Sequence, residues 1–88
     1  MTSRTVRVVN ALGMHARAAA RFVGVASGFR SRVQVTRAHR TVDGKSILGL
    51  LLLSAARGVD ITIQADGDDE TDAVEALAGL VAEGFGES

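Results

Sequence analysis

The stretch Gly13-Met14-His15-Ala16-Arg17 stands immediately ahead of an apolar-periodic run, Ala18-Ala19-Ala20-Arg21-Phe22-Val23. We expect a helix to begin here, carrying one imidazole at its start and one guanidinium two residues later. A helix start collects unpaired backbone N–H groups and partial positive charge, so it binds anions and favours a neutral imidazole over imidazolium. The stretch therefore predicts a neutral ring nitrogen beside an anion-binding backbone, which is what a phosphoryl acceptor requires.

Periodicity extends this junction into a complete fold. Alternation of apolar and polar residues predicts strands over residues 5–8, 32–37, 40–42 and 60–65. Helical spacing predicts one helix from Ala16 to a glycine cap at Ser27-Gly28, one over residues 47–56, and one from about Asp69 onward. The order β-α-β-β-α-β-α predicts an α+β two-layer open-faced sandwich, with three helices on one face of a four-stranded antiparallel sheet. We expect residues 1–88 to form a single domain.

Three end signals accompany these elements. Ser46 stands where an N-cap belongs, ahead of the second helix, and Gly58 follows the last basic residue as a C-cap would. Acidic residues crowd the first turn of the last helix, where the helix dipole favours them. We expect the C-terminal residues 84–88 to fray.

Charge is divided sharply along the chain although the total is zero. Residues 1–57 contain ten basic residues and one acid, Asp43, and so carry +9, whereas residues 58–88 carry −9. One interpretation is a basic face that meets an acidic partner. The other is that the two halves interleave in the fold and neutralise each other.

Composition excludes several classes of protein. With no cysteine there is no disulfide and no cysteine-based metal site, as suits a reducing cytoplasm. The N-terminus lacks the apolar run of a signal peptide, and no stretch approaches the roughly 20 apolar residues of a membrane span. We therefore expect a soluble cytoplasmic protein without membrane insertion. A nucleic-acid-binding domain is a third hypothesis, disfavoured because only three Phe residues and no Tyr or Trp could stack on bases.

His15 is the candidate reactive group, although a lone histidine is more often structural. Gly13 is expected to let the backbone approach a ligand closely, and Arg17 to pair an anion's oxygens. The backbone N–H groups of Ala16 and Arg17 are the expected phosphoryl-binding donors. No carboxylate accompanies the histidine in the sequence, so cofactor-free and metal-free phosphoryl transfer to the ring fits best. The other histidine, His39, lies in a polar turn and has no specific role assigned.

Three segments together carry a family resemblance: Gly13-Met14-His15-Ala16-Arg17, Gly44-Lys45-Ser46-Ile47-Leu48-Gly49 and Gly58-Val59-Asp60-Ile61-Thr62-Ile63. The chain resembles the HPr family, the histidine phosphocarriers of the bacterial phosphoenolpyruvate-dependent phosphotransferase system. The resemblance implies that His15 accepts phosphate from enzyme I and passes it to an EIIA component, while Arg17 stabilises the transferred group. It also implies that Nδ1 of the ring is the site and that Nε2 is exposed. Such a protein is a relay with a phosphohistidine intermediate, and we expect a monomer that forms transient complexes.

The family's commonest pattern has proline after the arginine, whereas this chain has Ala18. In having alanine at this position, the chain resembles the nitrogen-related branch of the family. The resemblance to this branch favours a regulatory role over a role in sugar uptake. An alternative function is therefore a regulatory protein whose phosphorylation at His15 or Ser46 controls partner proteins. The resemblance implies phosphorylation of Ser46 by an HPr kinase/phosphorylase; the sequence leaves open whether Ser46 is this site as well as a helix cap.

The second helix carries too many leucines for one buried face, so some of them should be exposed as an interface. The resemblance assigns Ile47, Leu48 and Leu51 to the surface that docks partner proteins beside the histidine. Arg21 lies four residues after Arg17 on the same helical face and is expected to extend the basic rim of that surface. A more deeply buried helix, or a dimer contact, are the alternatives.

Overall fold

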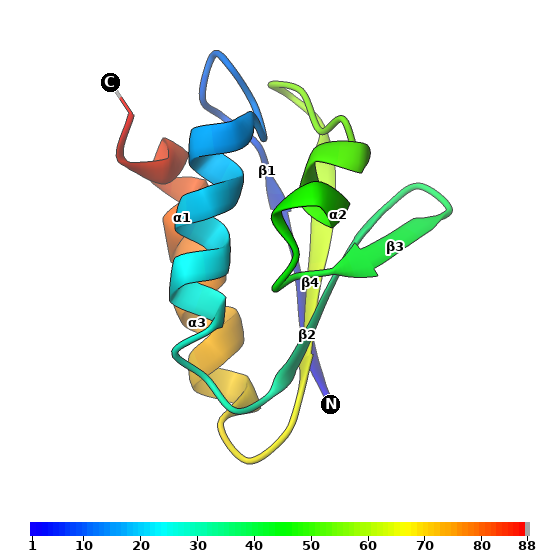
Figure 1. Ribbon diagram of the computed structural model, residues 1–88, viewed down its shortest axis with the longest axis vertical. Helices are drawn as coiled ribbons and strands as arrows, with labels where there is room; N and C mark the ends of the chain where they lie inside the picture. Colours follow the sequence, from blue (N-terminus) through cyan, green and yellow to red (C-terminus); the bar gives the residue numbers. More distant parts are fainter. Residues whose placement is uncertain (88) are drawn as a thin grey trace.

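The computed structural model describes residues 1–87, and Ser88 lies outside the described part of the chain. Its elements follow the expected order. They are β1 (Thr2–Arg7), α1 (Ala16–Ala26), β2 (Arg32–Arg37), β3 (Arg40–Asp43), α2 (Ile47–Leu52), β4 (Asp60–Asp66), α3 (Glu70–Ala82) and a short 3-10 turn (Gly84–Gly86). The predicted α+β open-faced sandwich is confirmed, with the helices packed against one face of the sheet (Figure 1).

The sheet is antiparallel throughout, in the order β1-β4-β2-β3. β4 is central because its neighbours β1 and β2 pair with both of its edges. Alternate residues of β4, namely Ile61, Ile63 and Ala65, are buried beneath the helices. On the opposite face, one row of paired residues crosses all four strands as Thr5, Thr62, Thr36 and Thr41. The strict alternation of β4 explains why its strand was predictable from sequence.

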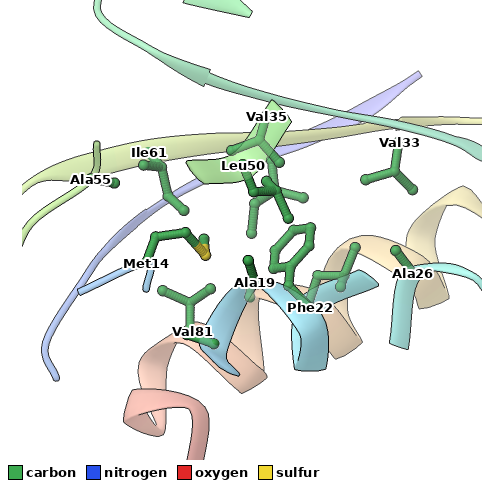
Figure 2. Packing of buried hydrophobic residues seen from close by; sticks show 14 of the residues in the cluster. Met14, Ala19, Phe22, Ala26, Val33, Val35, Leu50, Ala55, Ile61 and Val81 are labelled. Carbon is green, nitrogen blue, oxygen red and sulfur yellow. The ribbon is translucent and has the colours of Figure 1, made fainter. Parts of the chain in front are cut away.

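The core lies between the sheet and the helices. Phe22 of α1 and Leu50 of α2 are fully buried against Val35 and Ile61 of the sheet layer (Figure 2). The small residues Ala18, Ala19 and Ala26 are also fully buried on α1. Alanines on the packed face let α1 lie close to its neighbours, so the core is mostly aliphatic, with Phe22 as the aromatic ring that α1 contributes.

Helices α1 and α3 lie side by side and antiparallel, so the turn at Gly84–Gly86 after α3 reaches α1 (Figure 1). The expectation that residues 84–87 fray is wrong, while Ser88 lies outside the described residues. Phe85 is fully buried, with a left-handed backbone (φ 58°), and Arg21 donates a hydrogen bond to its carbonyl. Burial of one aromatic ring is enough to anchor a short terminal segment.

The first two helices end differently from the sequence-based expectation. The first helix ends at Ser27 in a right-handed conformation, and the expected left-handed cap at Gly28 is not formed. The second helix stops at Leu52 instead of residue 56, since Ser54 turns left-handed (φ 52°). Arg40 and Arg37 donate to the carbonyls of Leu52 and Leu53 at 2.6 and 2.9 Å and so replace the helix bonds.

Gly58, expected to cap the second helix, instead leads into β4. Its N–H donates to the carbonyl of Val8 at 2.7 Å, which ties the end of β1 to the start of β4. The N-cap at Ser46 is confirmed, because its Oγ accepts from the N–H of Gly49 at 3.0 Å. Across the described residues, no helix is long and apolar enough to cross a membrane.

The two charged halves of the chain interleave in the sheet. The acidic half supplies β4, which lies between the basic strands β1 and β2. Arg7 and Asp60 pair across β1 and β4 at 3.0 Å, and the amino group of Met1 reaches Glu70 at 2.7 Å. Opposite charges of the two halves are therefore paired at the sheet, whereas Arg17, Arg21 and Arg57 lie together near the start of α1.

Candidate functional site

His15 is the N-cap residue of α1. Its backbone is extended (φ −79°, ψ 178°) and its carbonyl accepts the helix bond from Ala19 at 2.8 Å. The ring turns back over the helix start, so that Nδ1 accepts from the N–H of Arg17 at 3.3 Å. A quarter of the side chain remains exposed. The expected helix start beside an exposed imidazole is thus present, with one ring nitrogen directed at the backbone N–H groups.

The structure gives Gly13 a packing role that the sequence did not suggest. Its backbone is left-handed (φ 63°), and a Cβ placed there would lie 2.5 Å from the carbonyl oxygen of Ala55. The next N–H, that of Met14, donates to the same carbonyl at 2.9 Å. The glycine therefore permits close packing against the segment after α2. This packing and the buried Met14 side chain fix the loop that precedes His15 (Figure 2).

A hollow of about 980 Å³ lies between this loop, the start of α1 and the end of α3. His15 opens into it together with Arg17, Arg21 and Arg57. Within residues 1–87, the side chains of Arg17 and Arg57 form no hydrogen bond or ion pair, so both guanidinium groups are available to an anion. Arg57 was not selected from the sequence, since it is 42 positions from His15 and belongs to no recognisable motif.

Glu87 is the residue that sequence reasoning missed most clearly. One of its carboxylate oxygens contacts Nε2 of His15, and the other accepts from Nδ2 of Asn10 at 2.8 Å. The Asn10 hydrogen bond lowers the pKa of Glu87, with smaller contributions from His15 and the charge of Arg21. The expectations of a histidine without a carboxylate and of an exposed Nε2 are therefore wrong. No local pattern could signal a pairing across 72 positions.

Metal ligands were not expected. In the described range of the chain, histidine and carboxylate side chains nowhere gather in threes around a possible metal ion. His15 and Glu87 contact each other directly, and the hollow is otherwise lined by three arginines, the carboxylate Glu83 and mostly small or apolar residues. The chemistry of this donor set suits an anion.

The second helix exposes part of its leucine-rich surface. Ile47 and Leu48 are 42 and 67% exposed, as expected, whereas Leu51 is half-buried against the core. Leu52 and Leu12, which were not selected as docking residues, are exposed as well. Ser46 is half-buried at the start of this helix, so its hydroxyl lies beside the exposed pair Ile47 and Leu48.

Comparison with known proteins gives a consistent result. A family model described as "PTS HPr component phosphorylation site" matches residues 2–83. A relative from Cupriavidus necator, named phosphocarrier protein HPr, is 44% identical over 87 residues, covering 99% of this chain and 98% of that protein. The crystal structure of an HPr from Thermoanaerobacter tengcongensis superimposes with a TM-score of 0.96 at 40% identity, covering 100% of this chain and 99% of that one. Another structure from that organism, described as an HPr dimer, has a TM-score of 0.79 at 40% identity, covering 99 and 100% of the two chains.

Proposed function

The chain belongs to the HPr family, the phosphocarriers of the phosphotransferase system, and we propose that His15 is the residue that carries its phosphoryl group. One observation supports this assignment above all. His15 caps α1 with Nδ1 facing the helix N–H groups, and the same hollow is lined by Arg17 and Arg57, whose guanidinium groups have no partner within residues 1–87. An acceptor nitrogen, oriented donors and positive charge are what a phosphoryl group in transfer needs.

Each group at the site has a proposed task. The phosphoryl group binds to Nδ1, and the backbone N–H groups of Ala16 and Arg17 receive its oxygens. The side chain of Arg17 neutralises the charge that spreads over these oxygens during transfer. No cofactor is required, because the donor and the acceptor proteins supply the rest of the catalytic machinery. The chain is thus a relay rather than an independent enzyme.

We propose that enzyme I donates the phosphoryl group and that an EIIA component receives it, as family membership implies. The exposed Ile47 and Leu48, with the partly buried Leu51, form the proposed docking surface. Arg21 contributes its charge at the rim, although its guanidinium also binds the carbonyl of Phe85. We propose a cytoplasmic single-domain monomer in transient complexes with acidic partners, a state that sedimentation or scattering would test.

A regulatory role is the second candidate, and the position of Ser46 favours it. A phosphate at this N-cap would add about −1.5 to −2 charge at neutral pH. That charge would lie beside Ile47 and Leu48, where it would repel an acidic partner. An HPr kinase/phosphorylase is the enzyme that the family implies for this step. Such a protein would report metabolic state through His15 and Ser46, as the presence of Ala18 also suggests, instead of serving sugar uptake.

The central experiment is phosphorylation by phosphoenolpyruvate and purified enzyme I from the same organism, measured by intact mass. The parent should gain one acid-labile phosphate and His15→Ala none. His39→Ala is the matched control, because His39 is exposed in the β2–β3 turn and should be phosphorylated as the parent is. Transfer of the label to a purified EIIA component then tests the second half of the relay. A parent that takes no phosphate from an active enzyme I would refute the carrier function.

A further inference from the structure

We propose that Glu87 is a positioning residue for the phosphoryl transfer at His15, a proposal that rests on the function proposed above. Its carboxylate holds the ring proton on Nε2, which leaves Nδ1 unprotonated, with its lone pair directed at the start of α1. The same carboxylate then compensates the positive charge that the ring acquires when Nδ1 forms its bond to phosphorus.

The tautomer follows from the hydrogen-bonding groups around the ring. The backbone N–H of Arg17 is a donor only, so the nitrogen facing it, Nδ1, must be the acceptor. An ionised carboxylate is an acceptor only, so the nitrogen facing Glu87, Nε2, must carry the proton. Both contacts are satisfied by one neutral tautomer, and the other tautomer would break both of them.

Glu87 is held in place by contacts that do not involve the histidine. Nδ2 of Asn10 bridges the carbonyl of Gly13 and the carboxylate of Glu87, with both distances 2.8 Å. Asn10 is 7% exposed, so this bridge is largely shielded from water. The buried ring of Phe85, two residues earlier, anchors the backbone of the terminal segment. The lowered pKa of Glu87 agrees with a carboxylate that stays ionised.

The transfer step balances without loss of a proton. The Nδ1 lone pair forms the new N–P bond, while the old bond between phosphorus and the donor's leaving atom breaks and its electron pair returns to that atom. The proton stays on Nε2, and the ring of His15 becomes cationic. The Glu87 carboxylate stabilises this cation through the existing hydrogen bond, and donation to the next protein reverses each change.

Two substitutions separate the two effects of the carboxylate. Glu87→Gln keeps an oxygen that can accept from Nε2 but removes the charge, whereas Glu87→Ala removes both. Glu75→Gln is the matched control, since Glu75 is an exposed carboxylate on α3. Thermal unfolding of all variants shows whether each one keeps the fold. Two-bond ¹H–¹⁵N correlation spectra of the neutral His15 ring report which nitrogen carries the proton, independently of any phosphorylation.

We expect the parent, Glu87→Gln and Glu75→Gln to show only the Nε2–H tautomer, and Glu87→Ala to show a measurable Nδ1–H population. Single-turnover phosphorylation by enzyme I should slow about tenfold in both Glu87 variants, as loss of one charge-assisted hydrogen bond predicts, and remain unchanged in Glu75→Gln. An unchanged tautomer or an unchanged rate in Glu87→Ala would overturn the inference while the carrier function stood. A parent that takes no phosphate would instead overturn the carrier function.

Discussion

Asp69 accepts both the backbone N–H and the hydroxyl of Ser31, at 2.9 and 2.5 Å, across 38 positions of the chain. A third bond comes from the N–H of Arg30 at 2.9 Å. Asp69 occupies the N-cap position of α3, yet its side chain makes no capping bond to that helix. Its carboxylate instead joins the turn before α3 to the turn before β2, at the end of α1 opposite its start (Figure 1).

Replacing Asp69 should therefore loosen the contact between these two turns. Asp69→Asn keeps the size of the side chain but leaves an N–H donor facing the donors of Ser31, so thermal unfolding should occur at a lower temperature than in the parent. Asp68→Asn, one position earlier on an exposed site, should unfold with the parent. Equal unfolding temperatures for the two variants would contradict the role of this contact.

Acid should destabilise the fold through two carboxylates. The Ser31 hydroxyl, then the backbone of Arg30, lowers the pKa of Asp69 from 3.8 to about 2. The amino group of Met1, then Thr2, lowers the pKa of Glu70 from 4.5 to about 2. Because both pKa values are lower in the folded chain, their stabilisation is complete above about pH 4.5 and is lost as the pH falls toward 2.

Urea unfolding at a series of pH values would measure this loss. Asp69→Asn should flatten part of the decline, since it removes one of the two titrating groups. A parent whose free energy of unfolding stays constant between pH 4.5 and pH 2 would contradict both assignments.

Substitution by alanine at two glycines should change the free energy of unfolding in opposite directions. Gly13→Ala places a Cβ 2.5 Å from the Ala55 oxygen in a left-handed backbone, so it should reduce the free energy of unfolding by about 1–3 kcal/mol or more. Gly24 lies in α1 with no atom within 4 Å of an added Cβ, and Gly24→Ala should increase stability by about 0.5–1 kcal/mol. Chemical denaturation of the two variants measures both changes in the free energy of unfolding. A Gly13→Ala variant more stable than the parent would refute the packing described for this loop.

Arg17→Ala should impair transfer without impairing the fold. Since the Arg17 side chain bonds to no other group within residues 1–87, its loss should leave the unfolding temperature unchanged. Loss of its charge near the phosphoryl oxygens should slow phosphorylation by enzyme I on the order of 10²-fold. Rapid-quench kinetics measure the rate, and Arg17→Lys should recover part of it. Parent-like kinetics in Arg17→Ala would exclude the side chain from the transfer step.

Substitution of two leucines of α2 should affect stability in one case and partner binding in the other. Leu50 is fully buried, so Leu50→Ala should lower the free energy of unfolding by about 2–5 kcal/mol. Leu48 is 67% exposed, so Leu48→Ala should leave stability nearly unchanged while weakening the complex with enzyme I. Calorimetric titration against enzyme I tests the second expectation. Unchanged affinity in Leu48→Ala would place the docking surface elsewhere.

Local sequence patterns were enough to predict most of the helices and strands. Alternation placed β2 and β4 to within a residue, and the apolar spacing after His15 placed the start and length of α1. These predictions succeeded because each depends on which face of one strand or helix is buried, a property of consecutive residues. The choice of His15 as the candidate reactive residue was also a local prediction, since it depends on a helix start and its nearest neighbours.

The end of the second helix and the packing of Gly13 were not predicted, and both have a different cause. The second helix ends early because Arg37 and Arg40, from the β2–β3 hairpin, bind its last carbonyls. Gly13 is needed because Ala55 packs against it after the chain has passed through two helices and two strands. Both are contacts between elements, and local patterns carry no signal for them.

The sequence by itself determined the strand and helix order, the buried faces of β4, α1 and α3, and the imidazole at a helix start. Only the tertiary structure decided what surrounds that imidazole. Antiparallel packing of α1 and α3 brings Glu87 to Nε2 of His15, and burial of Phe85 holds it there. The physical reason is that the tautomer of the ring depends on hydrogen-bond partners in space, and one of these partners arrives from 72 positions away.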